Sequence, residues 1–278
     1  MSYDETHAGR LKDIKAMASR LNSIVNADNA IAHNCIVRDK YLGSTISAAQ
    51  SAAIRNGTFR DVYTGDYWQS TWPAYSWTDS DGTVHQESAR SGGIAWHIYG
   101  CNFFMLKPNN NVAVPGNHVV VMPRDGLLLN RMNPTASTEG GYVNSEAFKN
   151  IIPQLEGLIK AVFGEDHVMP HYDYLCNAVT DGVETGYAYY ENRLCDLPTM
   201  EMVFGFPNPS KGNLAGSMMQ FPLFALRPEF AVAGGTHKWL RDVADASSFR
   251  CINFNGGVDR LAANDTTHAK FAPFFLLH

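Results

Sequence analysis

Residues 221–278 decide the fold expected for this chain: FPLFALRPEF AVAGGTHKWL RDVADASSFR CINFNGGVDR LAANDTTHAK FAPFFLLH. Two apolar segments, Phe221–Phe230 and Lys270–Leu277, are rich in aromatic and branched residues, as β-strands are. A polar, turn-rich segment separates them. We therefore expect the two apolar ends to pair in one sheet and the polar middle to lie over its surface.

Three motifs resemble a family of phage and prophage structural proteins that end in a C-type-lectin-like domain. They are W-L-R-D-V at 239–243, G-T-F-R-D-V-Y-T-G-D-Y at 57–67, and M-N-P-T followed by G-G-Y-V within 132–143. The closing motif departs from the family, because 270–275 (KFAPFF) keeps the proline and an aromatic residue but lacks Gly-Val-Arg. The wider group includes retroelement-diversified tropism determinants, which bind host surfaces.

The resemblance implies an α+β protein with an N-terminal helical arm (1–56) and a C-type-lectin-like β domain with helical insertions (57–278). It implies a phage virion structural protein that attaches to a host-cell or mucosal protein or glycan and contacts other virion proteins. Neither catalysis nor a cofactor or metal is expected. A homo-oligomer is expected, with a trimer as the first choice, because fibre-like virion parts are commonly cyclic assemblies.

The segment Asp242–His268 contains no Lys, Glu, Gln, Met or Trp. These types make up 39 of the 278 residues, so about four are expected in the segment from composition alone. Retroelement mutagenesis confined to adenines of Asn codons leaves this composition, and so does an ordinary turn-rich loop. The resemblance favours the first interpretation, and we expect 242–268 to be the exposed, variable segment.

The candidate ligand-binding residues all lie in this polar segment. Aromatic, Arg, Asn and Ser side chains on a fixed scaffold are typical of a recognition surface, where Phe254, Arg250 and Arg260 would contribute most contact area. The full set is Asp245, Ser247, Phe249, Arg250, Asn253, Phe254, Asn255, Asp259, Arg260, Asn264, Asp265 and His268. Asp259, Asn264 and Asp265 also carry oxygens suited to calcium, although solvated loop residues are the simpler interpretation.

Two other functions remain as alternatives. The chain is a capsid decoration or neck protein without a ligand, or an enzyme of the formylglycine-generating type, which shares the broad lectin-like fold. The enzyme requires two late cysteines to meet at a metal, and Cys195 and Cys251 are the only late pair. A thiol site at His171, Asp173 and Cys176 has poor spacing on the helix expected there, so we interpret these residues as structural.

Composition excludes several other classes of protein. The net charge is −5 and no basic run occurs, which argues against nucleic-acid binding. No apolar run reaches the ~20 residues of a membrane span, so membrane insertion is not expected. The polar N-terminus is not a signal peptide, which predicts synthesis in the bacterial cytoplasm and a final location in the virion. The five cysteines form no C-x-x-C motif and are expected to be buried thiols.

Hydrophobic periodicity places the remaining elements. A heptad seam of Leu11, Ile14, Ala18, Leu21 and Val25 predicts a helix over 6–33, which suits either oligomerisation or packing on its own domain. Further helices are expected over 45–56 with a cap at Ser44 or Thr45, over 145–163 with a kink at Pro153, and over 171–179. Strands are expected over 57–68, 93–106 and 118–122, a hairpin over 72–86, and a turn-rich stretch over 181–192.

Overall fold

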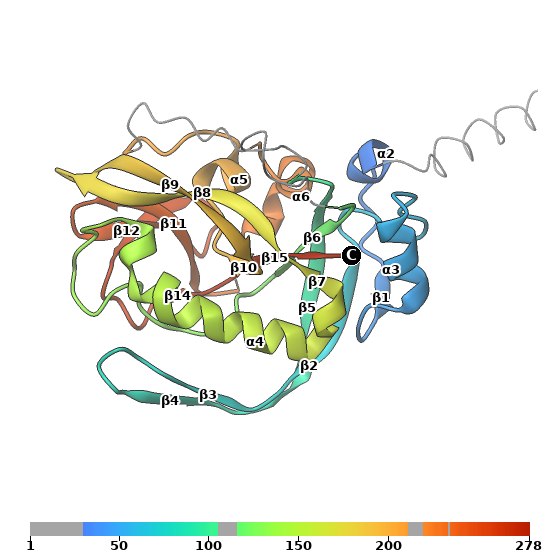
Figure 1. Cartoon of the computed structure of the whole chain (residues 1–278), viewed down its shortest axis with the longest axis horizontal. Coiled ribbons are helices and arrows are strands. Elements are labelled where there is room, and N and C mark those ends of the chain that lie inside the picture. The colour runs from blue at the N-terminus through green and yellow to red at the C-terminus, as the bar shows by residue number, and fades with distance from the viewer. Residues whose placement is uncertain (1–29, 105–115, 211–218, 233) are drawn as a thin grey trace, which may run out of the picture.

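The computed structural model describes residues 30–104, 116–210, 219–232 and 234–278 (Figure 1). Both helices and many strands are present, so the protein is α+β, as predicted. The helix expected over 6–33 falls outside the described residues except at its end, where α2 spans Ala30–Asn34. His278 lies beside α3 (Ala48–Arg55), because Ser51 Oγ of this helix donates a hydrogen bond to the His278 carbonyl at 2.9 Å.

The larger sheet has seven strands within the described residues. Their order is β1-β2-β5-β6-β15-β10, and β7 also pairs with β15. The C-terminal strand β15 therefore lies inside the sheet, antiparallel to β6, β7 and β10. The bounds are β1 Tyr41–Gly43, β2 Tyr67–Trp72, β5 Arg90–Cys101, β6 Val119–Pro123, β7 Val168–Met169, β10 Cys195–Asp196 and β15 Phe274–Leu277.

The two faces of this sheet pack against different helices. Val121 and Phe275 face a core shared with α4 (Ile152–Phe163), while Val120 and Phe274 face a core shared with α5 (Met200–Phe204) and α6 (Pro222–Leu226). The alternation follows from the strand pleat, which sends successive side chains to opposite faces. Short 3-10 helices at Tyr142–Asn144, Glu165–His167 and Pro228–Ala231 complete the helical elements.

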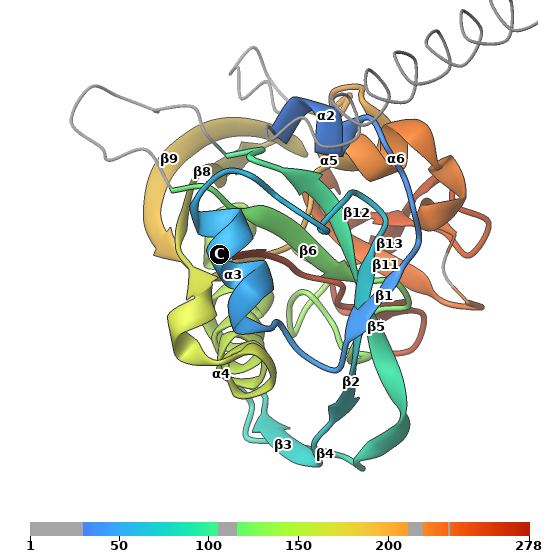
Figure 2. The same ribbon diagram turned by 90° about the vertical axis from the view of Figure 1, so that its right-hand side faces the viewer.

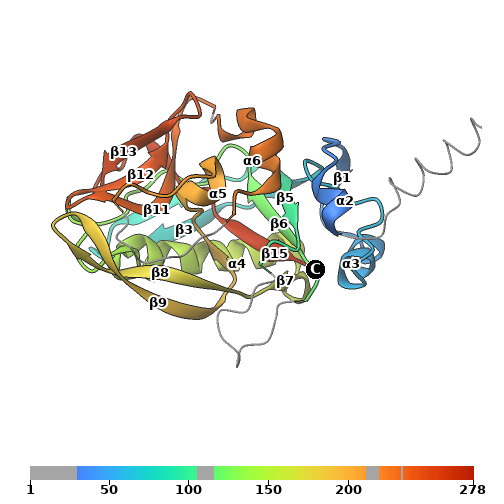
Figure 3. The same cartoon turned by 90° about the horizontal axis from the view of Figure 1, so that it is seen from above.

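A second sheet of four strands, in the order β13-β12-β11-β14, lies at the end of the molecule opposite α3 (Figure 3). Two separate hairpins, β3–β4 and β8–β9, extend from the body, and β3–β4 reaches furthest in Figure 2. The bounds are β11 His237–Asp245, β12 Ser248–Ile252, β13 Val258–Ala262, β14 Ala269–Lys270, β3 Tyr75–Thr78, β4 Val84–Glu87, β8 His171–Thr180 and β9 Val183–Arg193.

The predicted helices over 45–56 and 145–163 are confirmed, with differences at their starts. α3 is capped by Ser47 rather than Ser44 or Thr45, because Ser47 and Gln50 form a reciprocal capping box. Ser145 caps the later helix as expected, accepting a hydrogen bond from the Phe148 amide at 3.1 Å. A π-helical turn over Ala147–Ile151 precedes α4, and it accommodates Pro153, which has no amide hydrogen to donate.

Four sequence predictions are wrong. Of the strand expected over 57–68, only residues 67 and 68 are strand, as the start of β2; residues 57–66 form turns, because Phe59 and Asp61 adopt positive φ angles of 48° and 61°. The helix expected over 171–179 and the turns expected over 181–192 are the paired strands β8 and β9. The strand expected over 221–230 is helical, and Pro222 and Pro228 start its two helices. Phe221–Phe230 therefore covers the larger sheet and does not pair with the C-terminal strand.

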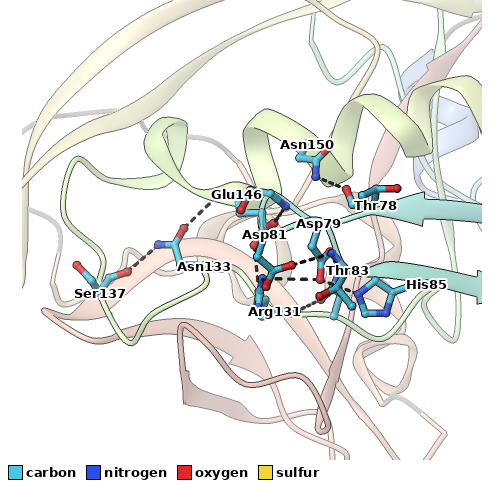
Figure 4. Close-up of polar contacts among 12 residues, drawn as sticks. Thr78, Asp79, Asp81, Thr83, His85, Arg131, Asn133, Ser137, Glu146 and Asn150 are labelled. Atoms are coloured by element: carbon cyan, nitrogen blue, oxygen red, sulfur yellow. Dashed lines mark hydrogen bonds and ion pairs between the residues drawn. The ribbon is translucent and has the colours of Figure 1, made fainter.

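The predicted β3–β4 hairpin is confirmed and is held to the body by several polar contacts, among them those of Arg131 (Figure 4). Arg131 contacts Asp81 at 2.7 Å on the hairpin turn and Glu146 at 3.0 Å beside the π-helical turn. Asp79 accepts hydrogen bonds from Asn130 at 2.9 Å and contacts His85 at 2.6 Å. The long hairpin is thus fixed at its turn by polar contacts, whereas the four-stranded sheet is fixed by its core.

Candidate ligand-binding surface

The β12–β13 hairpin forms the exposed edge of the four-stranded sheet, and its side chains alternate between two faces. Arg250 pairs with Arg260 across the hairpin, and Cys251 pairs with Asp259. Cys251 belongs to the core shared with α4, so Asp259 points to that face and Arg250 and Arg260 to the other. β13 is an edge strand, and side chains on both of its faces reach solvent.

The strand that pairs with the hairpin in the same sheet is β11, which carries the W-L-R-D-V motif at 239–243. Trp239 Nε1 donates to the Asn130 carbonyl at 2.8 Å, and the Asp242 carboxylate accepts from the Met200 amide at 2.8 Å. Arg241 is buried and pairs with Asp173 and, at 3.4 Å, with Asp196. Trp239, Arg241 and Asp242 therefore each bond to other groups of the fold, and the motif belongs to the interior and not to the surface.

One group of candidate residues gathers around His237, and we call it the His237 side. Phe254, at the turn between β12 and β13, is 51% exposed, and its ring lies edge-on to His237 with centroids 5.8 Å apart. The half-exposed Asp259 carboxylate is 3.9 Å from His237 Nε2. An exposed aromatic ring beside a carboxylate and an imidazole gives this side both apolar area and hydrogen-bonding capacity.

The turn that carries Phe254 has a fixed backbone. The Asn253 side-chain oxygen accepts hydrogen bonds from the amides of Asn255 and Gly257, both at 2.9 Å. Gly256 has φ 85°, and a Cβ atom there would lie 3.0 Å from Val232 Cγ2. Only glycine meets both conditions without strain. Asn253 is therefore a structural residue of the turn, and Phe254 is presented on a rigid backbone.

The turn after β13 closes against the same side. The exposed His268 contacts Asp265 at 2.7 Å, and its carbonyl accepts a hydrogen bond from the His237 amide at 2.9 Å. Burial raises the pKa of Asp265, but hydrogen bonds from Thr267 and His268 outweigh it, so the pKa lies below its usual value. Asn255 and Asn264 are exposed beside these residues and complete the predicted set on the two turns.

The opposite side of the hairpin carries charged groups that already have partners, and we call it the Arg260 side. Arg260 contacts Asp245 at 2.9 Å, and Asp245 also accepts hydrogen bonds from the Ser247 amide and hydroxyl at 2.9 Å. Burial raises the pKa of Asp245, but these hydrogen bonds and Arg260 bring it below its usual value. Arg250 donates to Asn208 at 3.2 Å and is only partly exposed.

Phe249 requires a correction, because it was predicted to contact ligand and is fully buried. It pairs with Val243 on β11 and belongs to the core shared with α4. Sequence reasoning also missed His237, and it missed Asn208 and Ser210, whose side-chain oxygens accept hydrogen bonds from Arg250 at 3.2 and 3.3 Å. Strand alternation from Trp239 places His237 two residues earlier on the same face, at the strand end. Asn208 and Ser210 come from a distant loop and have no local signal.

The alternative chemical sites have buried groups that do not meet. Cys195 lies in the larger sheet against the Ile152 carbonyl, while Cys251 lies in the four-stranded sheet. Burial raises the pKa of the Cys176 thiol to about 12, which opposes thiolate formation at neutral pH. Four of the five cysteines are buried, and Cys35 is exposed, contrary to prediction.

Within residues 30–104, 116–210, 219–232 and 234–278, no group of three His, Cys, Asp or Glu side chains is arranged to hold a metal ion. No helix in those ranges is both long and apolar enough to span a bilayer. Comparison of the chain with protein-family models, with curated proteins and with solved structures gave no match.

Proposed function

We propose that this chain is a phage virion protein with a C-type-lectin-like domain, and that it attaches to a host-surface protein or glycan through the His237 side. The observation that carries the proposal is Phe254, an exposed aromatic ring on a turn whose backbone is fixed by Asn253 and Gly256. Exposed aromatic residues on rigid turns give large contact area at low entropic cost, which is typical of binding anchors.

The arrangement of the scaffold supports the lectin-like part of the proposal. The C-terminal strand returns into the larger sheet, and a separate four-stranded sheet presents the segment 242–268 at one end of the molecule. On β12, Phe249 and Cys251 face the core shared with α4, whereas Arg250 on the opposite face and Asp259 and Arg260 on the edge strand β13 reach solvent. Such a sheet tolerates changes on its solvent side without loss of its core, which suits retroelement diversification.

Binding to cells tests the surface directly. The fluorescently labelled chain is incubated with a panel of bacterial cells and with a printed glycan array. The amount of bound protein is compared between the unchanged chain and the variants Phe254→Ala and Asp259→Asn. We expect Phe254→Ala to weaken attachment at least about tenfold, because truncation of an aromatic hot-spot residue costs about 2 kcal/mol or more and about 1.4 kcal/mol is tenfold. The matched control is Val84→Ala, which removes another exposed apolar side chain (60% exposed) from the β3–β4 hairpin.

Equal attachment by Phe254→Ala, Asp259→Asn and the control would reject the His237 side as the binding surface. In that case the capsid decoration or neck protein without a ligand becomes the better interpretation. The virion assignment is tested separately by mass spectrometry of purified phage particles. A binding-competent protein that is absent from particles would remove the virion part of the proposal and leave the binding part.

A further inference from the structure

A cavity of about 480 Å³ opens on the larger sheet, and Val232 in its wall also lies against Gly256 of the turn between β12 and β13. Tyr67 on β2 and His97 on β5 are directly paired and form part of its wall. Both side chains lie on the face of the sheet whose apolar core is covered by α5 and α6. The Phe230 ring packs against one side of the His97 imidazole, with ring centroids 4.9 Å apart. The cavity has the volume of a small-molecule site.

Three charged side chains line this cavity without neutralising one another. They are Asp39, Arg124 and Asp125. Among the described residues, no ion pair joins Arg124 to either aspartate, and the nearest basic partner of Asp39 is His97 Nδ1 at 3.9 Å. The Arg124 guanidinium instead lies over the Phe230 ring, 5.0 Å from its centroid. On the hairpin, by contrast, the exposed Arg260 and Asp245 pair directly.

His97 contributes a neutral acceptor to the wall. Its Nδ1 is 3.1 Å from the Gly65 carbonyl, which only accepts, so Nδ1 carries the proton. Burial lowers the pKa of His97, and the imidazole is therefore neutral at pH 7, with Nε2 unprotonated. The ring of Tyr67 lies 5.0 Å from the imidazole and adds an aromatic surface to the same wall.

We propose that this cavity binds a small dipolar molecule that carries an ammonium group and an acidic group, such as a free amino acid. The aspartates and the aromatic ring of Tyr67 attract the ammonium group, and Arg124 binds the acidic group. A simple anion would meet two carboxylates, and a simple cation would meet the guanidinium. A molecule with both charges satisfies both sets. The proposal goes beyond the function proposed for the hairpin, because none of the candidate binding residues of the hairpin lines the cavity.

The experiment is calorimetric titration with free α-amino acids and with ω-amino acids of increasing length, which report the spacing between the two charges. We expect at least one to bind, and both Asp39→Asn and Arg124→Met to weaken its binding about five- to tenfold. Asn keeps the positive φ of residue 39 (59°), and Met keeps an apolar stem over Phe230. Added salt should also weaken binding, because it screens the attraction between the charges of the ligand and those of the cavity.

Matched controls are available at residues that do not line the cavity. Asp61→Asn changes another exposed aspartate at positive φ (61°), and Arg60→Met changes the exposed arginine beside it. Both should leave binding unchanged. N-acetyl and amide derivatives of the best ligand each remove one charge, and both should bind worse. They also distinguish a free amino acid from a peptide end, which lacks one of the two charges.

Three outcomes would overturn the proposal. The first is that no dipolar molecule binds. The second is that binding persists unchanged in both Asp39→Asn and Arg124→Met. The third is that neutral monosaccharides bind in preference to amino acids, which would mean that the cavity recognises hydroxyl groups. Because the hairpin variants are assayed on cells and these variants by titration, failure of one proposal leaves the other intact.

Discussion

The inner strand β11 and the edge strand β13 carry the same chemistry in opposite environments. Arg241 on β11 has 5% of its side chain exposed and pairs with Asp173 and Asp196. Arg260 on β13 has 62% exposed and pairs with Asp245. Both arginines lie on strands of the same four-stranded sheet and contact aspartate, but Arg241 is buried with two partners and Arg260 is exposed with one.

The difference decides which arginine can serve binding. A buried charge must have its partners supplied by the fold, because removing one partner leaves the others uncompensated in a medium of low polarity. An exposed pair contributes little to stability, because water and salt screen it. Contacts on β13 can therefore be exchanged for contacts with a ligand, whereas those on β11 are part of the scaffold.

The largest expected effect is that of Arg241→Met. Removing this charge leaves Asp173 and Asp196 buried without their partner, and we expect the free energy of unfolding to fall by about 3–5 kcal/mol. The measurement is chemical denaturation followed by tryptophan fluorescence. Adding Asp173→Asn and Asp196→Asn to Arg241→Met should recover part of the loss. A loss below about 1 kcal/mol would contradict the comparison.

Arg131→Met should have an intermediate effect. Arg131 is 14% exposed and holds the buried Glu146 and the exposed Asp81, so its burial lies between those of the other two arginines (Figure 4). We expect the free energy of unfolding to fall by about 2 kcal/mol. We also expect proteolysis within the β3–β4 hairpin before global unfolding. A hairpin as resistant to protease as in the unchanged chain would show that Arg131 does not hold it.

The Arg131 effect should depend on pH. Hydrogen bonding from Arg131 and from Thr83 holds the pKa of Asp81 well below its usual value. A lowered pKa in the folded state gives stability that is present above the unfolded pKa of about 3.9 and is lost as pH falls below it. The difference between the unchanged chain and Arg131→Met should thus be constant from pH 5 to 8 and shrink below about pH 4. The stability that is lost below about pH 4 should be absent from Asp81→Asn, because this variant has no carboxylate at position 81 to titrate.

The smallest expected effect on stability is that of Arg260→Met. Its pair with Asp245 is exposed, so we expect less than about 1 kcal/mol of change, which high salt should reduce further. The same denaturation experiment, repeated at low and high salt, measures it. A loss comparable to that of Arg241→Met would mean that β13 is part of the scaffold, and its use as a replaceable binding surface would fail.

Local signals in the sequence predicted the β3–β4 hairpin, α3, α4 and the C-terminal strand, and the α+β class followed from the resemblance of its motifs. Asp81-Gly82 marks the hairpin turn, and Ser145 caps the helix that leads into α4. Local signals failed where packing decided. Phe59 and Asp61 lie in an alternating pattern that predicts a strand, yet both residues have positive φ. Residues 171–179 are predicted to be a helix but belong to β8, which pairs with β9.

For the site, the sequence located the polar segment on one hairpin, but only the tertiary structure divided it between two faces. Phe249 and Phe254 are chemically alike and five residues apart. One is in the core because Val243 lies across from it, and the other is exposed because it falls on the turn. The cavity at His97 was decided wholly by folding, since Asp39 and Arg124 are 85 residues apart and meet only when β2, β5 and β6 pair. Local composition fixes periods and turns, and long-range pairing fixes which side chains share a surface.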